Sequence, residues 1–220
     1  MARNDNGRQA DLQVPMGENM VLLHTCCAPC SSAIIEALVR GGVTPVIYYC
    51  NPNIYPREEY EIRKNECTRY AQSLGLEIVD ADYDHDNWLE AVKGLEDEPE
   101  RGGRCLRCFK LRLLRTAEYA CQRGIKVMTT TLASSRWKSL DQISEAGFWA
   151  CEELRKQMGA ASSPVVWWDR NWRKGGLQER RLQIIKEYDF YNQLYCGCEF
   201  SMKNNFTTFV KESSSNNQGL

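Results

Sequence analysis

The sequence predicts an α/β domain built on a parallel sheet with helices on both faces. Short apolar runs alternate with longer segments whose apolar residues recur at helical spacing, and this alternation is typical of parallel sheets. The run 43–50 is apolar almost throughout, as expected for a strand that is buried on both faces. Ligands of such sheets bind beyond the carboxyl ends of the strands. We therefore expect functional residues in the loops that follow the strands.

The individual elements follow from apolar periodicity and from glycines and caps at the ends of segments. The predicted strands are 20–25, 43–50, 76–82, 126–132 and a short one at 165–168, and the predicted helices are 31–40, 56–74, 86–92, 104–123, 139–158 and 177–195. Ser139 is the expected N-cap of the fifth helix. The fourth helix carries a predicted apolar stripe of Leu111, Leu114 and Tyr119. The loops 26–30, 51–56 and 133–138 should share one rim of the sheet.

The chain has 220 residues and a formal net charge of −1. These values predict a single domain over residues 19–201, between a disordered leader (1–18) and a disordered tail (202–220). A nucleic-acid partner would need a local basic patch, because the overall charge is close to zero. No apolar run has the length of a signal peptide core or a membrane span. We expect a cytoplasmic protein.

Eleven cysteines are many for a cytoplasmic chain of this size. In a reducing compartment they indicate metal binding or redox catalysis rather than a disulfide framework. Cys50, Cys67, Cys121 and Cys151 stand alone in apolar or amphipathic surroundings, and we expect them in the core or on helix faces.

The first thiol group is Cys26, Cys27 and Cys30, at the junction of a strand and a helix. Pro29 suits a first helical turn because it has no N–H group to lose there. The helix N-terminus favours a thiolate, which is both a nucleophile and a metal ligand. The alternative is that the three are buried structural cysteines.

The second thiol group is Cys105 and Cys108, flanked by Arg104 and Arg107, which should lower the pKa values of both thiols. Together with Cys26 and Cys27 it offers four thiolates, a set that suits zinc or an iron–sulfur cluster. An adjacent pair is awkward for one tetrahedral ion, which favours the cluster. Cys30 is a possible fifth ligand.

The third thiol group is Cys196-Gly197-Cys198. A disulfide across one residue closes a small strained ring, and such bonds are easily reduced and often catalytic. The alternatives are two further metal ligands or two inert thiols.

Two stretches combine tryptophan with basic residues: Arg136-Trp137-Lys138 and residues 167–174. Basic side chains bind phosphates and exposed tryptophans stack on unpaired bases. The alternative, a buried tryptophan beside a solvated charge run, is favoured for Trp167 and less so for Trp172. Further positive charge near the second thiol group comes from Arg101, Arg104, Arg107, Lys110, Arg112 and Arg115. Of the two histidines, His24 is expected to be a satisfied core residue.

Taken together, the motifs resemble the QueH family of epoxyqueuosine reductases over about residues 20–201. The matching series is His24-x-Cys26-Cys27-x-Pro29, Tyr49-x-Asn51-Pro52-Asn53-Ile54-x-Pro56-x-x-Glu59-Tyr60-x-x-Arg63, Arg104-Cys105-x-x-Cys108-Phe109-x-x-Arg112-Leu113, Thr129-Thr130-Thr131-Leu132-x-Ser134-Ser135-x-x-Lys138, Arg173-Lys174-Gly175-Gly176 and Tyr195-Cys196-Gly197-Cys198-Glu199-Phe200-Ser201. Several ordered motifs together make the resemblance specific. Two positions depart from the expected pattern: Cys30 stands where we expect Asp, and Arg136 where we expect Pro.

The resemblance implies a three-layer fold like that of the adenine-nucleotide alpha hydrolases (HUP), with a C-terminal helical extension. It implies reduction of epoxyqueuosine to queuosine at the wobble position of tRNA with a GUN anticodon (Asp, Asn, His, Tyr), with an external electron donor. It implies a [4Fe-4S] cluster on Cys26, Cys27, Cys105 and Cys108, and leaves open an additional mononuclear iron. It implies a redox pair of Cys196 and Cys198, and substrate binding by Asn51, Asn53, Tyr55, Arg63, Ser134, Lys138, Arg173 and Lys174. The chain has no Ser-Gly-Gly-x-Asp-Ser pyrophosphate loop after the first strand, which argues against ATP use.

Two other function classes remain open on the residues alone. A zinc-stabilised, non-catalytic RNA-binding module would explain the C-x-x-C motif and the basic tryptophan stretches, but would leave Cys196 and Cys198 without a role. A metal-free thiol–disulfide oxidoreductase would use the thiols, but the layout is not that of a thioredoxin.

Overall fold

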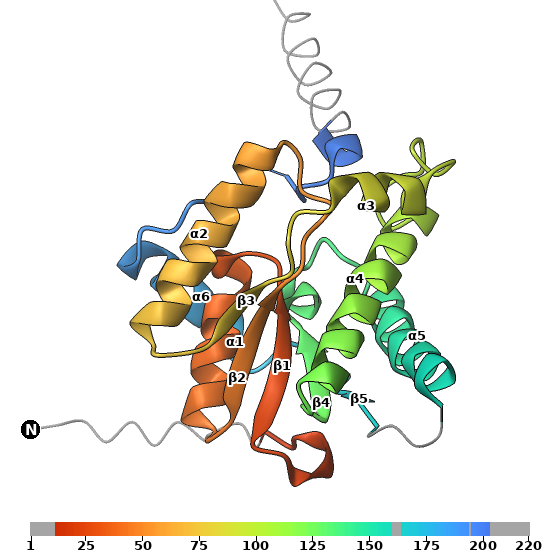
Figure 1. The fold of residues 1–220 in the computed structure, drawn as a ribbon. Helices are drawn as coiled ribbons and strands as arrows, with labels where there is room; N and C mark the ends of the chain where they lie inside the picture. Colours follow the sequence, from red (N-terminus) through yellow and green to blue (C-terminus); the bar gives the residue numbers. More distant parts are fainter. Residues whose placement is uncertain (1–11, 160–163, 194, 203–220) are drawn as a thin grey trace, which may run out of the picture.

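The computed structural model describes residues 12–159, 164–193 and 195–202, and Figure 1 shows its fold. Over these residues the chain forms one sheet of five strands in the order β3-β2-β1-β4-β5. The strands are β1 (Met20–Thr25), β2 (Thr44–Tyr49), β3 (Ile78–Asp80), β4 (Val127–Thr130) and β5 (Val166–Trp167). Every pair of neighbours is parallel. The predicted α/β fold with a parallel sheet is confirmed.

Helices form the two outer layers of this three-layer arrangement. They are α1 (Ala28–Arg40), α2 (Arg57–Ser73), α3 (His85–Val92), α4 (Gly103–Gln122), α5 (Leu140–Met158) and α6 (Leu177–Glu187), with 3-10 turns at Pro15–Gly17 and Thr131–Ser134. Figure 1 shows α1, α2 and α6 grouped on one side of the sheet and α4 and α5 on the other. The arrangement agrees with the HUP-like sandwich and with a helical extension after β5.

Two helix boundaries differ from the prediction by more than one residue. Helix α1 begins at Ala28, three residues early, because Pro29 fits the first turn and Cys27 serves as N-cap. Cys30 therefore lies within the first turn. Helix α6 ends at Glu187, and the segment that follows runs irregularly along α2, where Phe190 packs against Tyr70.

The buried face of α4 is not the predicted one. Phe109, Leu113, Ala117 and Ala120 are buried, whereas Leu111, Leu114 and Tyr119 are only partly so. The buried face also carries Arg104 and Arg112. The prediction fails because it leaves every arginine out of the buried face. An arginine can be buried when its guanidinium finds hydrogen-bond acceptors.

Residues 12–18, which were expected to belong to a disordered leader, are ordered. Leu12 and Val14 pack against the hydrophobic core, and Pro15–Gly17 forms a 3-10 turn before β1. Residues 1–11 of the expected leader and 203–220 of the expected tail lie outside the described residues. In the described part of the chain, no helix is both long and apolar enough to cross a membrane.

Candidate functional site

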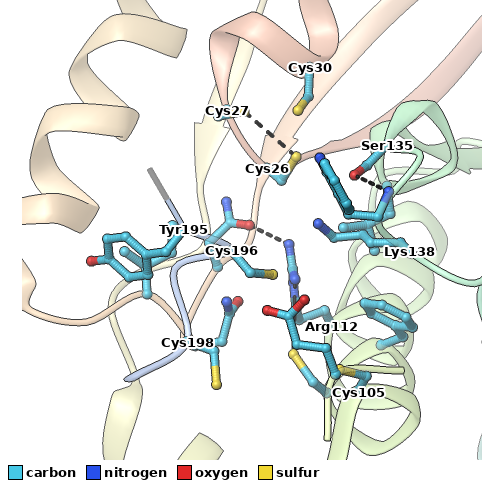
Figure 2. A pocket seen from close by; sticks show the side chains of 18 of the residues that line it. Cys26, Cys27, Cys30, Cys105, Arg112, Ser135, Lys138, Tyr195, Cys196 and Cys198 are labelled. Atoms are coloured by element: carbon cyan, nitrogen blue, oxygen red, sulfur yellow. Dashed lines mark hydrogen bonds between the residues drawn. The ribbon is translucent and has the colours of Figure 1, made fainter. Parts of the chain in front are cut away.

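A cavity of about 500 Å³ opens beyond the carboxyl ends of the central strands. Its wall contains seven cysteines from three distant segments: Cys26, Cys27, Cys30, Cys105, Cys108, Cys196 and Cys198. Figure 2 shows Cys26 and Cys30 on one side of the hollow and Cys105 and Cys198 on the other. The three thiol groups singled out in the sequence therefore share one site.

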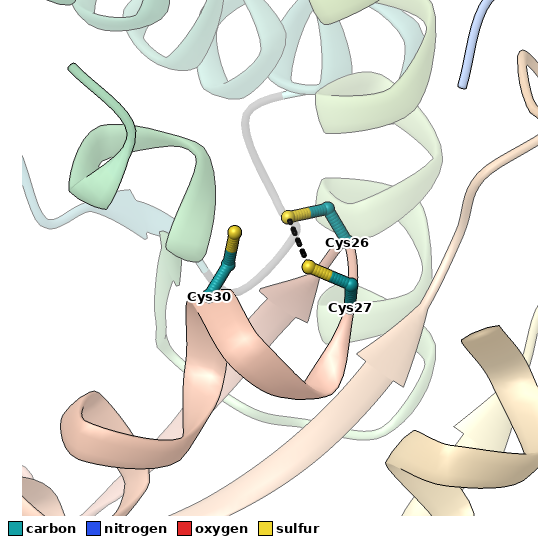
Figure 3. A group of neighbouring side chains, drawn as sticks. All are labelled: Cys26, Cys27 and Cys30. Atoms are coloured by element: carbon teal, nitrogen blue, oxygen red, sulfur yellow. Dashed lines mark hydrogen bonds between the residues drawn. The ribbon is translucent and has the colours of Figure 1, made fainter. Parts of the chain in front are cut away.

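The first group sits on the turn between β1 and α1, where Figure 3 shows three sulfur atoms gathered at the beginning of the helix. The Sγ atoms of Cys26, Cys27 and Cys30 all lie within 4.8 Å of one another, and those of Cys26 and Cys27 are 3.9 Å apart. Hydrogen bonds from the other two thiols hold the pKa of Cys26 well below its usual value. The pKa of Cys27 is raised, because its S–H group donates a hydrogen bond to the Cys26 thiolate and would lose that bond on ionisation. The group is therefore prepared to carry negative charge and bind a soft metal.

The second group lies in the first turns of α4. Burial raises the pKa of Cys105 to about 11 and outweighs the lowering by the positive charge of Arg104, so the expected net lowering is wrong for this thiol. The guanidinium of Arg104 points instead to the carbonyl oxygens of Glu96 and Glu98, to which it donates hydrogen bonds. The backbone N–H of Arg101 donates to Cys105 Sγ at 3.3 Å. This thiol is protonated until a metal or another positive charge displaces its proton.

The third group is held over the cavity by backbone contacts. Arg63 donates to the carbonyl oxygens of Tyr195 and Cys196, at 3.2 and 3.3 Å, and the N–H of Tyr55 donates to Gly197 O at 2.8 Å. A Cβ atom at Gly197, whose φ is +109°, would lie 2.9 Å from Ile54, so a side chain would disturb the turn. Cys196 is exposed and Cys198 buried, and both are free thiols.

Two cationic side chains, Arg112 and Lys138, lie between the thiol groups of the cavity. Arg112 is buried and donates to Cys50 O at 3.1 Å and to Asn51 Oδ1, while its Nη1 lies 3.9 Å from Cys108 Sγ. Burial lowers the pKa of Lys138, but the charges of the surrounding thiols outweigh burial and raise the pKa on balance. Figure 2 shows both side chains reaching in between the sulfur atoms. Both cations stabilise thiolates here.

Several buried polar atoms in the cavity wall have no hydrogen-bond partner in the described part of the chain. They are Asn53 Oδ1, Trp88 Nε1, Arg104 Nε, Gln142 Oε1 and Gln193 Oε1. Buried polar atoms are normally paired, so this concentration indicates a site that receives a polar ligand. Gln193 also donates through Nε2 to Cys27 Sγ at 2.9 Å.

The chain is similar to proteins of one named family. The family model described as "Epoxyqueuosine reductase QueH" matches residues 21–204. Proteins named epoxyqueuosine reductase QueH from Histophilus somni and Haemophilus influenzae are 47% and 46% identical over 192 residues, covering 87% of this chain and 76% and 75% of theirs. One of that name from Thermotoga maritima is 34% identical over 185 residues, covering 83% of this chain and 90% of its own.

The chain belongs to the QueH family of epoxyqueuosine reductases. This confirms the resemblance found in the sequence. The family consists of oxidoreductases of queuosine biosynthesis, so the thiol-rich cavity is the candidate active site of a QueH-family enzyme.

Only half of the substrate-binding residues that the QueH resemblance implied line the cavity. Asn51, Asn53, Arg63 and Lys138 line the cavity, whereas Tyr55, Ser134, Arg173 and Lys174 do not. Ser134 donates to Thr131 O at 2.8 Å and Cys30 O at 3.2 Å, and Arg173 donates to Lys138 O at 2.6 Å. Ser134 and Arg173 therefore stabilise the loops that form the cavity wall.

Other expectations have mixed outcomes. His24 is a buried core residue, as expected: its ring nitrogens pair with Thr130 Oγ1 at 2.7 Å and Cys50 O at 3.0 Å, and burial lowers its pKa to about 3. Trp167 is buried, as the sequence favoured, and Trp172, for which burial was less favoured, is completely buried as well. The wall residues Trp88, Gln142 and Gln193 were missed, because they belong to no cysteine or basic motif.

Proposed function

We propose that this chain reduces the epoxide of epoxyqueuosine, at the wobble position of tRNA, to the alkene of queuosine. The supporting observation is that seven cysteines from three segments line one cavity, in a chain of the QueH family. Removing the epoxide oxygen as water consumes two electrons and two protons, so the reaction needs reducing groups beside the substrate. Thiols are the reducing groups that this cavity supplies.

The chemistry of the donor set fits an iron–sulfur cofactor. We assign Cys26, Cys27, Cys105 and Cys108 as the residues that hold a [4Fe-4S] cluster, with Cys30, whose Sγ lies within 4.8 Å of those of Cys26 and Cys27, as a fifth candidate ligand. When bound, such a group supplies single-electron transfer and an iron that can polarise oxygen. Arg112 and Lys138 offset the negative charge of the thiolates that hold it.

Cys196 and Cys198 are the proposed redox pair. Oxidation of the two thiols to one disulfide releases two electrons and two protons. The epoxide gains them, and the products are the alkene, one water molecule and the disulfide, so atoms and electrons balance. An external electron donor then reduces the disulfide. The exposure of Cys196 allows such a donor to reach it.

The substrate in this proposal is a tRNA with a GUN anticodon, modified in the cytoplasm. The wobble nucleotide leaves the anticodon stack and its base enters the cavity. Asn51, Asn53, Arg63 and Lys138 contact it there. The side chains of Asn53, Gln142 and Gln193, whose unpaired oxygens are buried in the wall, rotate to accept hydrogen bonds from its polar groups. Tyr55 and Lys174, which lie outside the cavity, contact RNA beyond it, while Ser134 and Arg173 position the loops.

The test is anaerobic reconstitution with iron and sulfide, followed by reaction with epoxyqueuosine-containing tRNA and a chemical reductant. Nucleoside mass spectrometry should show queuosine formed at the expense of epoxyqueuosine. Cys196→Ser/Cys198→Ser should abolish turnover and keep RNA affinity, whereas Cys121→Ser, at a cysteine outside the cavity wall, should change neither. Reconstituted protein that leaves the epoxide intact would reject the proposal.

A zinc-stabilised RNA-binding module is the second candidate, and one observation favours it. Two thiolates on one tetrahedral zinc ion lie about 3.8 Å apart, close to the 3.9 Å between Cys26 and Cys27 Sγ. Metal analysis after anaerobic purification separates the candidates: one zinc and no iron supports the binding module, whereas about four irons, or about five with the additional mononuclear iron, support the reductase.

A further inference from the structure

One large aromatic side chain is displayed at the mouth of the cavity. Trp137 is 66% exposed and lines the cavity wall, on the loop 135–138 between the 3-10 turn Thr131–Ser134 and α5. Burying so large an apolar ring is favourable, and this domain buries Trp88 and Trp172 completely. An exposed ring at the rim is therefore available to a ligand.

The backbone beneath this ring is held in place by two arginines. Arg101 donates to Trp137 O at 2.9 Å and to Arg136 O at 3.1 Å. Arg173 donates to Lys138 O at 2.6 Å and to Ser135 O. All four carbonyl groups of the loop are thus fixed from outside it. The ring is presented on an ordered support, which reduces the entropy lost when it binds a partner.

Charge around the ring points to nucleic acid as that partner. The guanidinium of Arg136 lies 5.0 Å from the ring centroid of Trp137. In the described part of the chain, the cavity wall holds one acidic side chain, Glu100, against six basic ones: Arg63, Arg101, Arg104, Arg112, Lys138 and Arg181. Arg63, Arg104 and Arg112 are buried and Lys138 faces the thiols, so the positive charge available to a phosphate at the rim is that of the exposed Arg101 and Arg136. An exposed stacking ring beside exposed arginines matches a single-stranded nucleic acid, whose bases stack and whose phosphates are anionic.

We propose that Trp137 is the stacking platform for a base of the anticodon loop beside the nucleotide that enters the cavity. The inference rests on the proposed function for the identity of the RNA. Opening the anticodon stack to deliver one base leaves its neighbour without a stacking partner, and the indole ring replaces that partner at the rim. Arg136 supports the contact through its charge, and Arg101 and Arg173 are positioning residues.

The test compares Trp137→Leu, which removes the aromatic face, with Trp137→Phe, which keeps a smaller one. The probe is a fluorescently labelled anticodon stem-loop RNA carrying epoxyqueuosine, read by anisotropy, with an RNA duplex without a loop as reference. Trp137→Leu should weaken stem-loop binding about ten- to hundredfold, and Trp137→Phe a few-fold. Phe148→Leu is the control, since Phe148 is 56% exposed on α5 and outside the cavity wall.

Salt dependence separates stacking from charge. Arg136→Gln should make the slope of log affinity against log salt less steep by about 0.7, the value for one single-strand phosphate contact, while Trp137→Leu should leave the slope unchanged. Duplex binding should not respond to Trp137→Leu. Equal weakening on stem-loop and duplex would overturn the platform, because stacking requires an unpaired base.

Turnover distinguishes this inference from the proposed function. If the wild type reduces epoxyqueuosine and Trp137→Leu changes neither Kd nor KM, the platform is wrong and the proposed function stands. If Trp137→Leu weakens RNA binding but no variant reduces the epoxide, the platform stands and the proposed function fails. If Trp137→Leu lowers turnover only with a protein electron donor, and RNA affinity is unchanged, the ring docks that protein and the platform is wrong.

Discussion

Two stretches of similar composition lie in opposite environments in this molecule. Residues 136–138 and 167–174 both combine tryptophan with arginine and lysine. Trp137 is 66% exposed at the mouth of the cavity, whereas Trp167, Trp168 and Trp172 are buried in the domain core. Composition alone therefore does not separate a binding surface from a structural one.

The difference comes from the backbone partners of each stretch. Trp167 pairs with Met128 in the sheet, and the N–H of Trp168 donates to Met128 O at 2.8 Å. These contacts carry the chain along β4, where Trp172 Nε1 donates to Thr129 Oγ1 at 3.3 Å. Residues 136–138 pair with no strand, and their carbonyl groups are bound by arginine side chains instead. Sheet pairing thus places the tryptophans of the second stretch in the core, and its absence leaves Trp137 at the surface.

The largest expected effect on stability is at Trp172, in the buried stretch. Trp172→Ala should lower the free energy of unfolding by about 3–5 kcal/mol, because it removes a completely buried ring and leaves a cavity. Urea unfolding followed by circular dichroism measures the change, with Trp137→Ala as the matched control. A loss at Trp172 no larger than that at Trp137 would mean that the two environments are energetically alike.

A smaller effect is expected where α5 packs on Trp167. A Cβ atom at Gly147 would lie 2.2 Å from the Trp167 ring, so Gly147→Ala should destabilise the domain by about 1–3 kcal/mol through overpacking. In a helix without such a contact the same substitution stabilises, by up to about 1 kcal/mol. The sign of the change in unfolding midpoint therefore decides whether the contact exists. A higher midpoint would contradict the packing described here.

The sequence predicts the sheet, and the edge of the sheet at which Cys26 lies, for a physical reason. Parallel strands bring their carboxyl ends to one edge, so loops that follow different strands converge there. Cys26 follows β1, and the site at that edge gathers Cys105 and Cys196 as well. Alternation of apolar runs and helices was enough to predict this edge.

The rest of the site depends on tertiary packing that no local pattern records. Gln193 reaches Cys27 only because α6 ends at Glu187 and the chain then turns along α2, whereas the apolar periodicity predicted a helix to residue 195. The pKa of Cys105 depends on burial and on where Arg104 points, and neither follows from the flanking charges. Ser134 and Arg173 belong to family motifs but act on loop backbones.

Arg173 joins the two stretches and should give an intermediate effect. It follows the buried tryptophans in sequence but donates to Ser135 O and Lys138 O in the other stretch. Arg173→Met should cost about 1 kcal/mol of stability through these hydrogen bonds and should also weaken RNA binding by loosening the loop. Binding by the double variant with Trp137→Leu measures the coupling. Additive losses would indicate that Arg173 does not act through Trp137.

The smallest expected effect on stability is at Trp137 itself. Because its ring is mostly in solvent, Trp137→Leu should change the free energy of unfolding by no more than about 0.5 kcal/mol. Thermal and urea unfolding of this variant and of Trp172→Leu measure the contrast directly. A large loss at Trp137 would mean that the ring is part of the fold, and its exposure would then be no sign of a ligand. A negligible loss, together with a large loss of RNA affinity, leaves binding as the reason for a tryptophan at this position.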